Sequence, residues 1–225
     1  MAVTLVFSPL WFHGIDIALE LFSVLAAVLI SIMGYKAFKL TNDKKSLWLA
    51  AAFGFITLSF LARAITAGVV LMQVGIVPGI STPTPSMTAI ESIFDSGRFV
   101  YFALVFAAYL ILYALSAKIS DKKQLCLMSI FLGLFAFSAF QEIPIMFYIV
   151  SFVLLFFIAS NYIRNYQAKK TRSTFLISIA FSVMALEPLF SMIAIYYKPI
   201  IVAAYFFRLL AYVILLAMLV RVYRK

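Results

Sequence analysis

Long apolar runs separated by short polar segments occupy almost the whole of this sequence. The runs are about 20 residues long, the length of a helix that crosses a bilayer core about 30 Å thick. Of the 225 residues, 66% are hydrophobic and only 12% are charged, more apolar surface than a soluble domain of this length could bury. We therefore predict an all-α, polytopic membrane protein that forms one domain, residues 1–225, within the lipid bilayer.

The polar segments divide the chain into seven expected transmembrane helices. Thr88 and Glu91 have the spacing of a capping box, and Pro83 and Pro85 lie just before them, so the third helix has a defined start. The segment 75–87 before it is the only long loop that we expect. The expected helices span about residues 15–37, 46–74, 88–118, 124–140, 144–165, 173–197 and 199–223.

The short run 124–140, which contains no charged residue, separates two similar units of three helices. An odd linking helix lets a second unit enter the membrane in the same direction as the first, which gives a 3+1+3 arrangement. Such a parallel repeat has its axis along the membrane normal. Because apolar helices also match by chance, duplication and coincidence both stay open. The aligned residues are Ala52, Phe53, Leu58, Leu61, Arg98 and Phe102, opposite Ala180, Phe181, Leu186, Leu189, Arg208 and Tyr212.

Basic residues gather at alternate boundaries of the expected helices. Because Lys and Arg in short loops are retained in the cytoplasm, they predict a multi-pass protein of the cell membrane with the N-terminus outside and the C-terminus inside. They also explain the net charge of +10 as membrane flanks, so we expect no nucleic-acid partner. Fourteen of the eighteen share this face: Lys36, Lys39, Lys44, Lys45, Lys118, Lys122, Lys123, Arg164, Lys169, Lys170, Arg172, Arg221, Arg224 and Lys225.

Charged residues inside the apolar runs are the candidate functional residues. Each costs at least about 2.5 to 3.5 kcal/mol at the bilayer centre, so each normally faces a partner or water. At about 1.5 Å per helical residue, five of them should lie at a similar depth in the outer half of the membrane. These predicted ligand-binding residues are Glu20, Arg63, Arg98, Glu187 and Arg208.

Further polar residues should form an outer rim above these five. Spacings along the first and third helices place most of the rim residues on single helical stripes. Three arginines against two glutamates favour a small anionic ligand in a pocket open to the outside, although Asp16, Glu91 or Asp95 could balance that charge. Ion pairs that only hold the helices together are the alternative. The rim consists of His13, Asp16, Glu91, Asp95 and Glu142.

Pro188 directly follows Glu187 and should kink the sixth helix, because proline leaves the carbonyl of Met184 without its usual donor. His13 is the only histidine, and together with Asp16 and Glu20 it makes a weak set of metal ligands, so we predict no metal site. No sequence motif of a hydrolase or nucleotide-binding enzyme is present, and we expect neither an enzyme nor a cofactor. An intramembrane hydrolase that uses carboxylates alone stays open.

Three families of membrane proteins can be compared with this chain of seven expected helices with the N-terminus outside. Microbial rhodopsins share this layout, but the stretch 199–222 contains no lysine to hold retinal, so retinal is excluded. Small sugar transporters share the 3+1+3 plan, but their Pro-Gln motif is absent. The segments 35–41 (YKAFKLT), 53–55 (FGF) and 58–60 (LSF), about a tenth of the chain, resemble the seven-helix membrane region of some prokaryotic sensor histidine kinases. That resemblance implies a receptor-like protein that signals through a separate protein partner, in the cytoplasm or the membrane.

Two classes of function follow from the sequence. The first is an outward-facing binding protein, either a sensor or a small-solute transporter. The inner halves of the helices offer only scattered polar residues, which favours sensing over transport. The second is a structural or assembly subunit of a membrane complex, whose ion pairs hold the bundle together.

Overall fold

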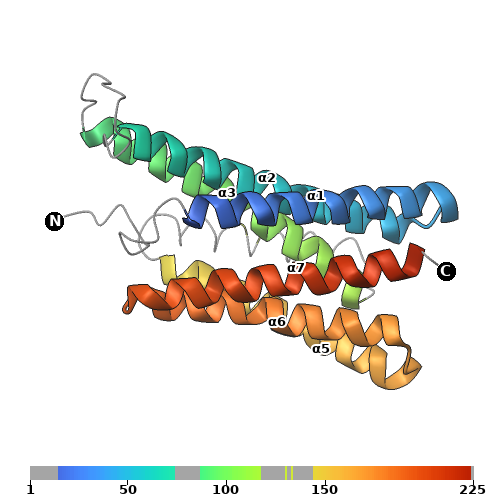
Figure 1. Cartoon of the computed structure of the whole chain (residues 1–225). Coiled ribbons are helices and arrows are strands. Elements are labelled where there is room, and N and C mark those ends of the chain that lie inside the picture. The colour runs from blue at the N-terminus through green and yellow to red at the C-terminus, as the bar shows by residue number, and fades with distance from the viewer. Residues whose placement is uncertain (1–14, 74–86, 118–129, 131–132, 134–143, 224–225) are drawn as a thin grey trace.

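The computed structural model describes residues 15–73, 87–117, 130, 133 and 144–223 (Figure 1). Within these residues the protein is built of helices and their short connections, and no strand occurs. The helices are α1 (Ile15–Thr41), α2 (Lys44–Gln73), α3 (Met87–Ala117), α5 (Pro144–Lys169), α6 (Arg172–Ala194), the short η2 (Lys198–Ile200) and α7 (Ile201–Tyr223).

Six helices in the described part of the chain are long and apolar enough to cross a membrane. The expectation of an all-helical chain with apolar, membrane-spanning helices is therefore confirmed. Apart from Ile130 and Gly133, the expected helix at 124–140 lies outside the described residues, as does the expected loop at 75–86. Seven helices in a 3+1+3 arrangement thus stay a prediction.

The chain reverses tightly between α1 and α2 and between α5 and α6. Asn42 has φ 57° and Lys170 has φ 48°, the left-handed conformation that ends a helix. The carboxylate of Asp43 then accepts from the Lys45 amide at 3.0 Å, and the Thr171 hydroxyl accepts from the Thr174 amide at 3.4 Å. These side chains satisfy amides that a helix start otherwise leaves unpaired, so each hairpin has a defined entry.

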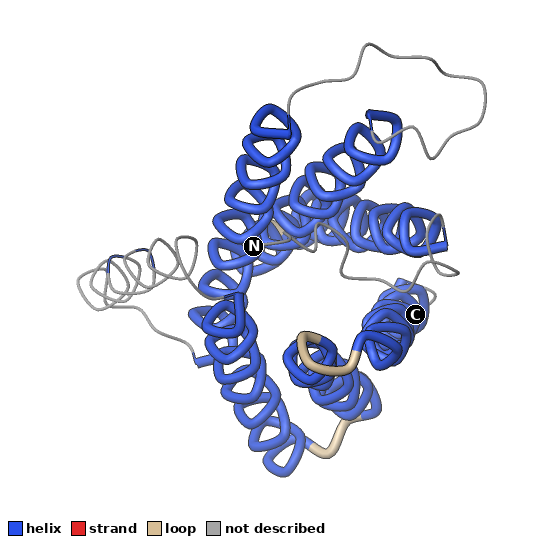
Figure 2. The backbone as a smooth tube through the Cα atoms, turned by 90° about the vertical axis from the view of Figure 1, so that its left-hand side faces the viewer, coloured by secondary structure: helices blue, strands red, loops and turns tan. Residues whose placement is uncertain are grey.

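The helices form two sets of three that meet along two seams. Within each set, α2 packs against α1 and α3, and α6 packs against α5 and α7; the sets touch through α1 with α7 and through α3 with α5. Figure 2 shows the six long helices end-on around a common centre. A rotation that exchanges the two sets would replace the α1–α7 seam by the α3–α5 seam. This pattern of contacts is the one expected of a repeat. The duplication itself stays a prediction.

Aromatic side chains fill the centre between the two sets. Tyr212 of α7 packs edge-on against Phe53 and Phe60 of α2, with ring centroids 6.4 and 6.1 Å apart. Phe147 of α5 stacks on Phe102 of α3 at 3.8 Å. All five are buried, so the bundle has an apolar core that joins helices from both sets.

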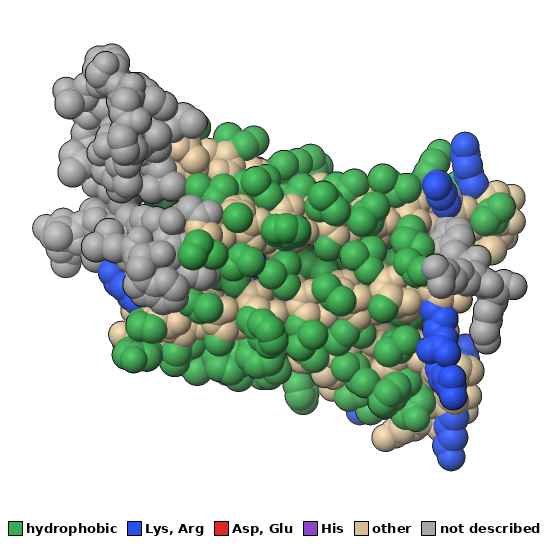
Figure 3. Space-filling model, in the orientation of Figure 1, with side chains coloured by type: hydrophobic (Ala, Val, Ile, Leu, Met, Phe, Trp, Pro, Cys, Tyr) green, Lys and Arg blue, Asp and Glu red, His purple; other side chains and the backbone are tan. Residues whose placement is uncertain are grey.

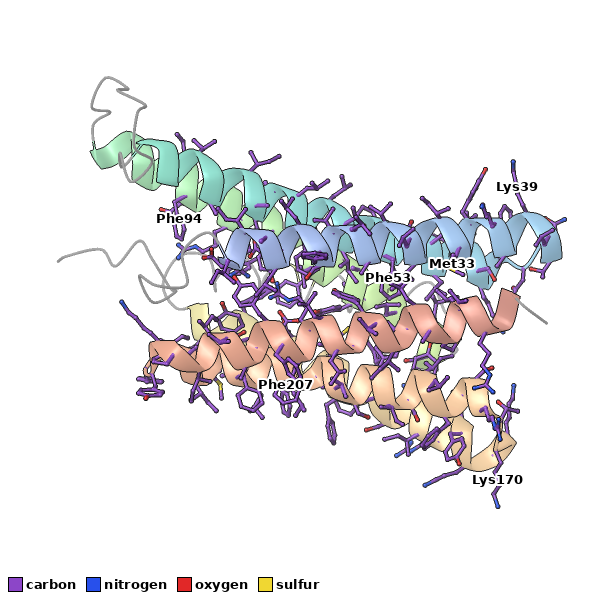
Figure 4. The ribbon with its side chains drawn as sticks, viewed as in Figure 1. Met33, Lys39, Phe53, Phe94, Lys170 and Phe207 are labelled. Carbon is purple, nitrogen blue, oxygen red and sulfur yellow. The ribbon has the colours of Figure 1, made fainter. Side chains whose placement is uncertain are left out.

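The surface of the bundle combines an apolar belt with a basic end. Large apolar side chains such as Phe22, Phe156 and Val213 are exposed, as lipid-facing residues are. Figure 3 shows Lys and Arg side chains gathered mainly at one end of the molecule. In Figure 4, Lys39 and Lys170 project at this same end, whereas Phe53 lies in the interior. One basic end is the pattern that the sequence predicted for a membrane flank.

Candidate functional site

Glu20, Arg63 and Tyr205 come from three different helices, α1, α2 and α7, and form a closed triangle of polar contacts. The Nε atom of Arg63 lies 2.7 Å from Oε1 of Glu20. Its Nη2 atom donates to the Tyr205 hydroxyl at 3.1 Å, and that hydroxyl donates to the same Glu20 oxygen, also at 3.1 Å. Glu20 is only 2% exposed, so its charge is compensated inside the bundle rather than by solvent.

Arg208 and Glu187 form a second ion pair between α7 and α6. The Nε atom of Arg208 donates to Oε1 of Glu187 at 2.8 Å, and its Nη2 atom donates to the same oxygen. Arg208 is 2% exposed and Glu187 is 7% exposed. Both charges are buried, and removal of either partner would leave the other uncompensated.

Tyr205 connects the two ion pairs. The guanidinium carbon of Arg208 lies 4.9 Å from the centroid of the Tyr205 ring, and that of Arg63 lies 5.8 Å from it. Arg63 also lies 5.2 Å from the centroid of Tyr101, and Arg208 lies 4.8 Å from that of Phe60. Aromatic faces attract cations at these distances, more strongly where water is excluded. We call Glu20, Arg63, Glu187, Arg208 and Tyr205 the ion-pair cluster.

Helix register explains why these side chains meet. Tyr205 and Arg208 are three residues apart on α7, which places them on one face of that helix. Glu20 and Arg208 lie near the starts of α1 and α7, and Glu187 lies near the end of α6. Since α1 and α7 run in the same direction and α6 runs opposite, all three positions fall towards the end of the bundle away from the basic one (Figures 1 and 3).

Two polar atoms of the cluster have no hydrogen-bond partner among the described residues. They are Oε2 of Glu20 and Nη1 of Arg208, and both are buried. A buried charged group that lacks a partner typically costs about 1 to 3 kcal/mol or more. The cluster therefore retains one strong acceptor and one strong donor after its internal ion pairs have formed.

Four of the five predicted ligand-binding residues meet in the cluster, and the fifth, Arg98, forms its ion pair elsewhere. Its Nη2 atom donates to Oδ1 of Asp95 at 2.9 Å, three residues earlier on α3. Asp95 is one of the three acidic residues expected to balance the arginines. Three guanidiniums thus face three carboxylates, and the expected excess of positive charge at this end is neutralised.

The remaining predicted residues are only partly covered by the structure. Asp16 lies one turn before Glu20 on α1, half-buried, and its Oδ1 atom accepts from the Ile17 amide at 2.9 Å. His13 and Glu142 lie outside the described residues, as does the side chain of Glu91. Within the described chain, no three His, Cys, Asp or Glu side chains are grouped as metal ligands. The helix α6 continues through Pro188, which is buried beside Glu187.

No protein-family model, no curated protein and no solved structure matches this chain. Tyr205, Tyr101 and Phe60 belong to the site, and sequence reasoning did not single them out. The position of Tyr205, three residues before an intramembrane arginine, is a signal that could have identified it, whereas Tyr101 and Phe60 reach the arginines only through the packing of α2, α3 and α7.

The arrangement can hold charged groups in place between four helices. Each carboxylate in the cluster is engaged by a guanidinium, Glu20 by Arg63 and Glu187 by Arg208. Aromatic rings on both sides lower the local polarity and strengthen charge-assisted hydrogen bonds. These are properties of a binding site or of a structural lock between helices.

Proposed function

We propose that this protein is an integral membrane receptor-like sensor that binds a small ligand with an anionic group at the ion-pair cluster. The observation that carries the proposal is the Nη1 atom of Arg208, a buried donor on a guanidinium that has no partner among the described residues. A carboxylate or similar acceptor on the ligand satisfies it. Arg63, whose side chain is 26% exposed, is the member of the cluster that a ligand reaches first.

The membrane orientation that we propose places the cluster near the outer surface. The basic end faces the cytoplasm, in accordance with the distribution of Lys and Arg, so the N-terminus lies outside and the C-terminus inside. Seven transmembrane helices in a 3+1+3 arrangement are part of this proposal. A ligand at the cluster contacts α1, α2, α6 and α7 together, and the basic end then offers a surface to a separate signalling partner.

Sensing is favoured over transport by the residues on the cytoplasmic side of the cluster. Phe53, Leu112, Ile158, Met184 and Tyr212 are all among the most deeply buried side chains of the described chain. A solute that crosses the bundle needs polar groups or water along its path, and this central packing is mainly apolar. The ligand therefore binds and leaves on the same side.

A structural or assembly subunit of a membrane complex is the second candidate function. The balance of charge among the ion pairs is the observation that supports it. The cluster and the Arg98–Asp95 pair contain equal numbers of positive and negative groups, which is sufficient to hold helices in register without a ligand. On this view the cluster needs no external partner.

Thermal unfolding of the purified protein in detergent, screened against small anions and carboxylates, separates the two candidates. A ligand at 100 times its dissociation constant adds about 2.7 kcal/mol to the stability of the folded state. A sensor predicts a compound that raises the midpoint of the native protein but not that of the double variant Glu187→Gln/Arg208→Gln. Arg164→Gln, at an exposed position on α5, is the matched control and should keep the shift. If no compound shifts the midpoint while Glu187→Gln and Arg208→Gln, each made alone, lower it, the cluster is a structural lock.

A further inference from the structure

Within the described residues, the ion-pair cluster has two complementary groups without partners, and both belong to side chains that contact Tyr205. Oε2 of Glu20 can only accept, and Nη1 of Arg208 can only donate. Oε1 of Glu20 is bound to the Tyr205 hydroxyl, and Arg208 lies over the Tyr205 ring at 4.9 Å. One small molecule at this tyrosine can therefore address both groups.

The internal contacts do not use up these two groups. Arg208 donates from Nε and Nη2 to a single oxygen of Glu187. The contacts of Glu20 with Arg63 and with Tyr205 are both made by Oε1. Glu20 and Arg208 are each 2% exposed, so solvent at the protein surface does not reach them freely. Buried donors and acceptors are nearly always hydrogen-bonded in folded proteins, so two that have no partner among the described residues, on side chains that both contact Tyr205, point to a bound group.

The charge balance decides what kind of group this is. With two carboxylates against two guanidiniums in the cluster, a ligand that carries a single charge would add an uncompensated charge to a buried site. A simple anion would satisfy Arg208 and leave Glu20 Oε2 unpaired, and a simple cation would do the reverse. A ligand with one positive and one negative group satisfies both atoms and adds no net charge.

We propose that the ligand is a small zwitterion of the amino-acid type, whose carboxylate accepts from Arg208 and whose ammonium group donates to Glu20. The inference rests on the proposed function and narrows it from an anion to a compound that carries both groups. The ammonium matches Glu20, because a carboxylate oxygen is its strongest partner. The ion pairs with Arg63 and Glu187 hold the side chains of Glu20 and Arg208 in place.

Binding measurements with matched compounds test this assignment. The full-length protein in detergent is titrated with the standard amino acids and 4-aminobutyrate, and with the same molecules that lack either the amino or the carboxylate group. The expected result is that at least one zwitterion binds on the order of ten- to a hundredfold more tightly than both of its one-charge analogues, the effect of one charge-assisted hydrogen bond.

Two variants then locate the two groups of the ligand. Glu20→Gln should abolish the advantage of the zwitterion over its carboxylate analogue and should not weaken binding of that analogue, because Arg208 is intact. Glu187→Gln/Arg208→Gln, which removes the second ion pair as a unit, should abolish binding of both. Asp43→Asn, in the α1–α2 turn at the opposite end, should change neither.

The outcomes distinguish this inference from the proposed function. Equal binding of a zwitterion and its carboxylate analogue would overturn the proposal that the ligand is a zwitterion, and would leave the proposed anion-binding site in place. Unchanged zwitterion selectivity in Glu20→Gln would overturn the role of Glu20. Binding of none of these compounds, in a protein that unfolds cooperatively, would overturn the zwitterion, and the wider anion screen would then decide the proposed function.

Discussion

The hydroxyl of Tyr205 on α7 donates to the carboxylate of Glu20 on α1 at 3.1 Å, although the two residues lie 185 positions apart. The contact joins the first and last described helices of the bundle at one of the two seams between its three-helix sets. The same hydroxyl accepts from Arg63, so a single oxygen atom ties three helices together.

Tyr205→Phe should lower the free energy of unfolding by about 1 to 3 kcal/mol, because Glu20 and Arg63 each lose a buried hydrogen bond. The ring remains, so its contact with Arg208 is retained. Denaturant titration in detergent measures the change. Tyr196→Phe is the matched control, since Tyr196 is 82% exposed and its substitution should stay within about 0.5 kcal/mol of the native protein. Equal effects of the two substitutions would show that the hydroxyl of Tyr205 is not engaged.

Arg208→Gln alone should destabilise the protein by about 3 to 5 kcal/mol, because it leaves the buried carboxylate of Glu187 uncompensated. The double variant Glu187→Gln/Arg208→Gln should be more stable than Arg208→Gln. A double-mutant cycle of unfolding free energies measures this coupling. Strictly additive effects would mean that the two side chains do not form the ion pair described here.

Gly97→Ala should destabilise the packing of α2 against α3 by about 1 to 3 kcal/mol, the usual cost of excess volume in a packed interior. A Cβ atom at Gly97 would clash with Oγ1 of Thr66 and lie 2.7 Å from the Cβ atom of Thr66, so the helices must separate. Gly68→Ala on α2 is the control, because a Cβ atom there meets nothing within 4 Å. A midpoint of thermal unfolding that is equally low for both variants would contradict the close approach at Gly97.

The proposed orientation predicts which loops are accessible from outside the cell. In a Cys126→Ser background, which removes the only native cysteine, Lys198→Cys should react with a membrane-impermeant maleimide in intact cells. Lys170→Cys should react only after the membrane is opened. Both positions are exposed, so a difference in labelling reports sidedness rather than burial. The reverse pattern would place the basic end outside and the ion-pair cluster on the cytoplasmic side.

The positions of the long apolar helices could be predicted from the sequence, because they depend on the length and the apolarity of continuous segments of the chain. The run predicted at 15–37 corresponds to α1 (Ile15–Thr41), and the run predicted at 199–223 corresponds to η2 and α7. Length and apolarity are sufficient for this, since a bilayer accepts only segments that satisfy their own backbone. The cost of a charge in lipid likewise identified Glu20, Arg63, Glu187 and Arg208 as residues that need partners.

The choice of partners depended on the tertiary structure. A helix can rotate about its axis at little cost to its own hydrogen bonds, so spacing along the chain does not determine which neighbour a side chain faces. The packing of the helices decided that Arg208 pairs with Glu187, that Arg63 pairs with Glu20, and that Arg98 pairs with Asp95 on its own helix. It also brought Tyr205 between Arg63 and Arg208, because the seam between α1 and α7 exists only in the folded bundle.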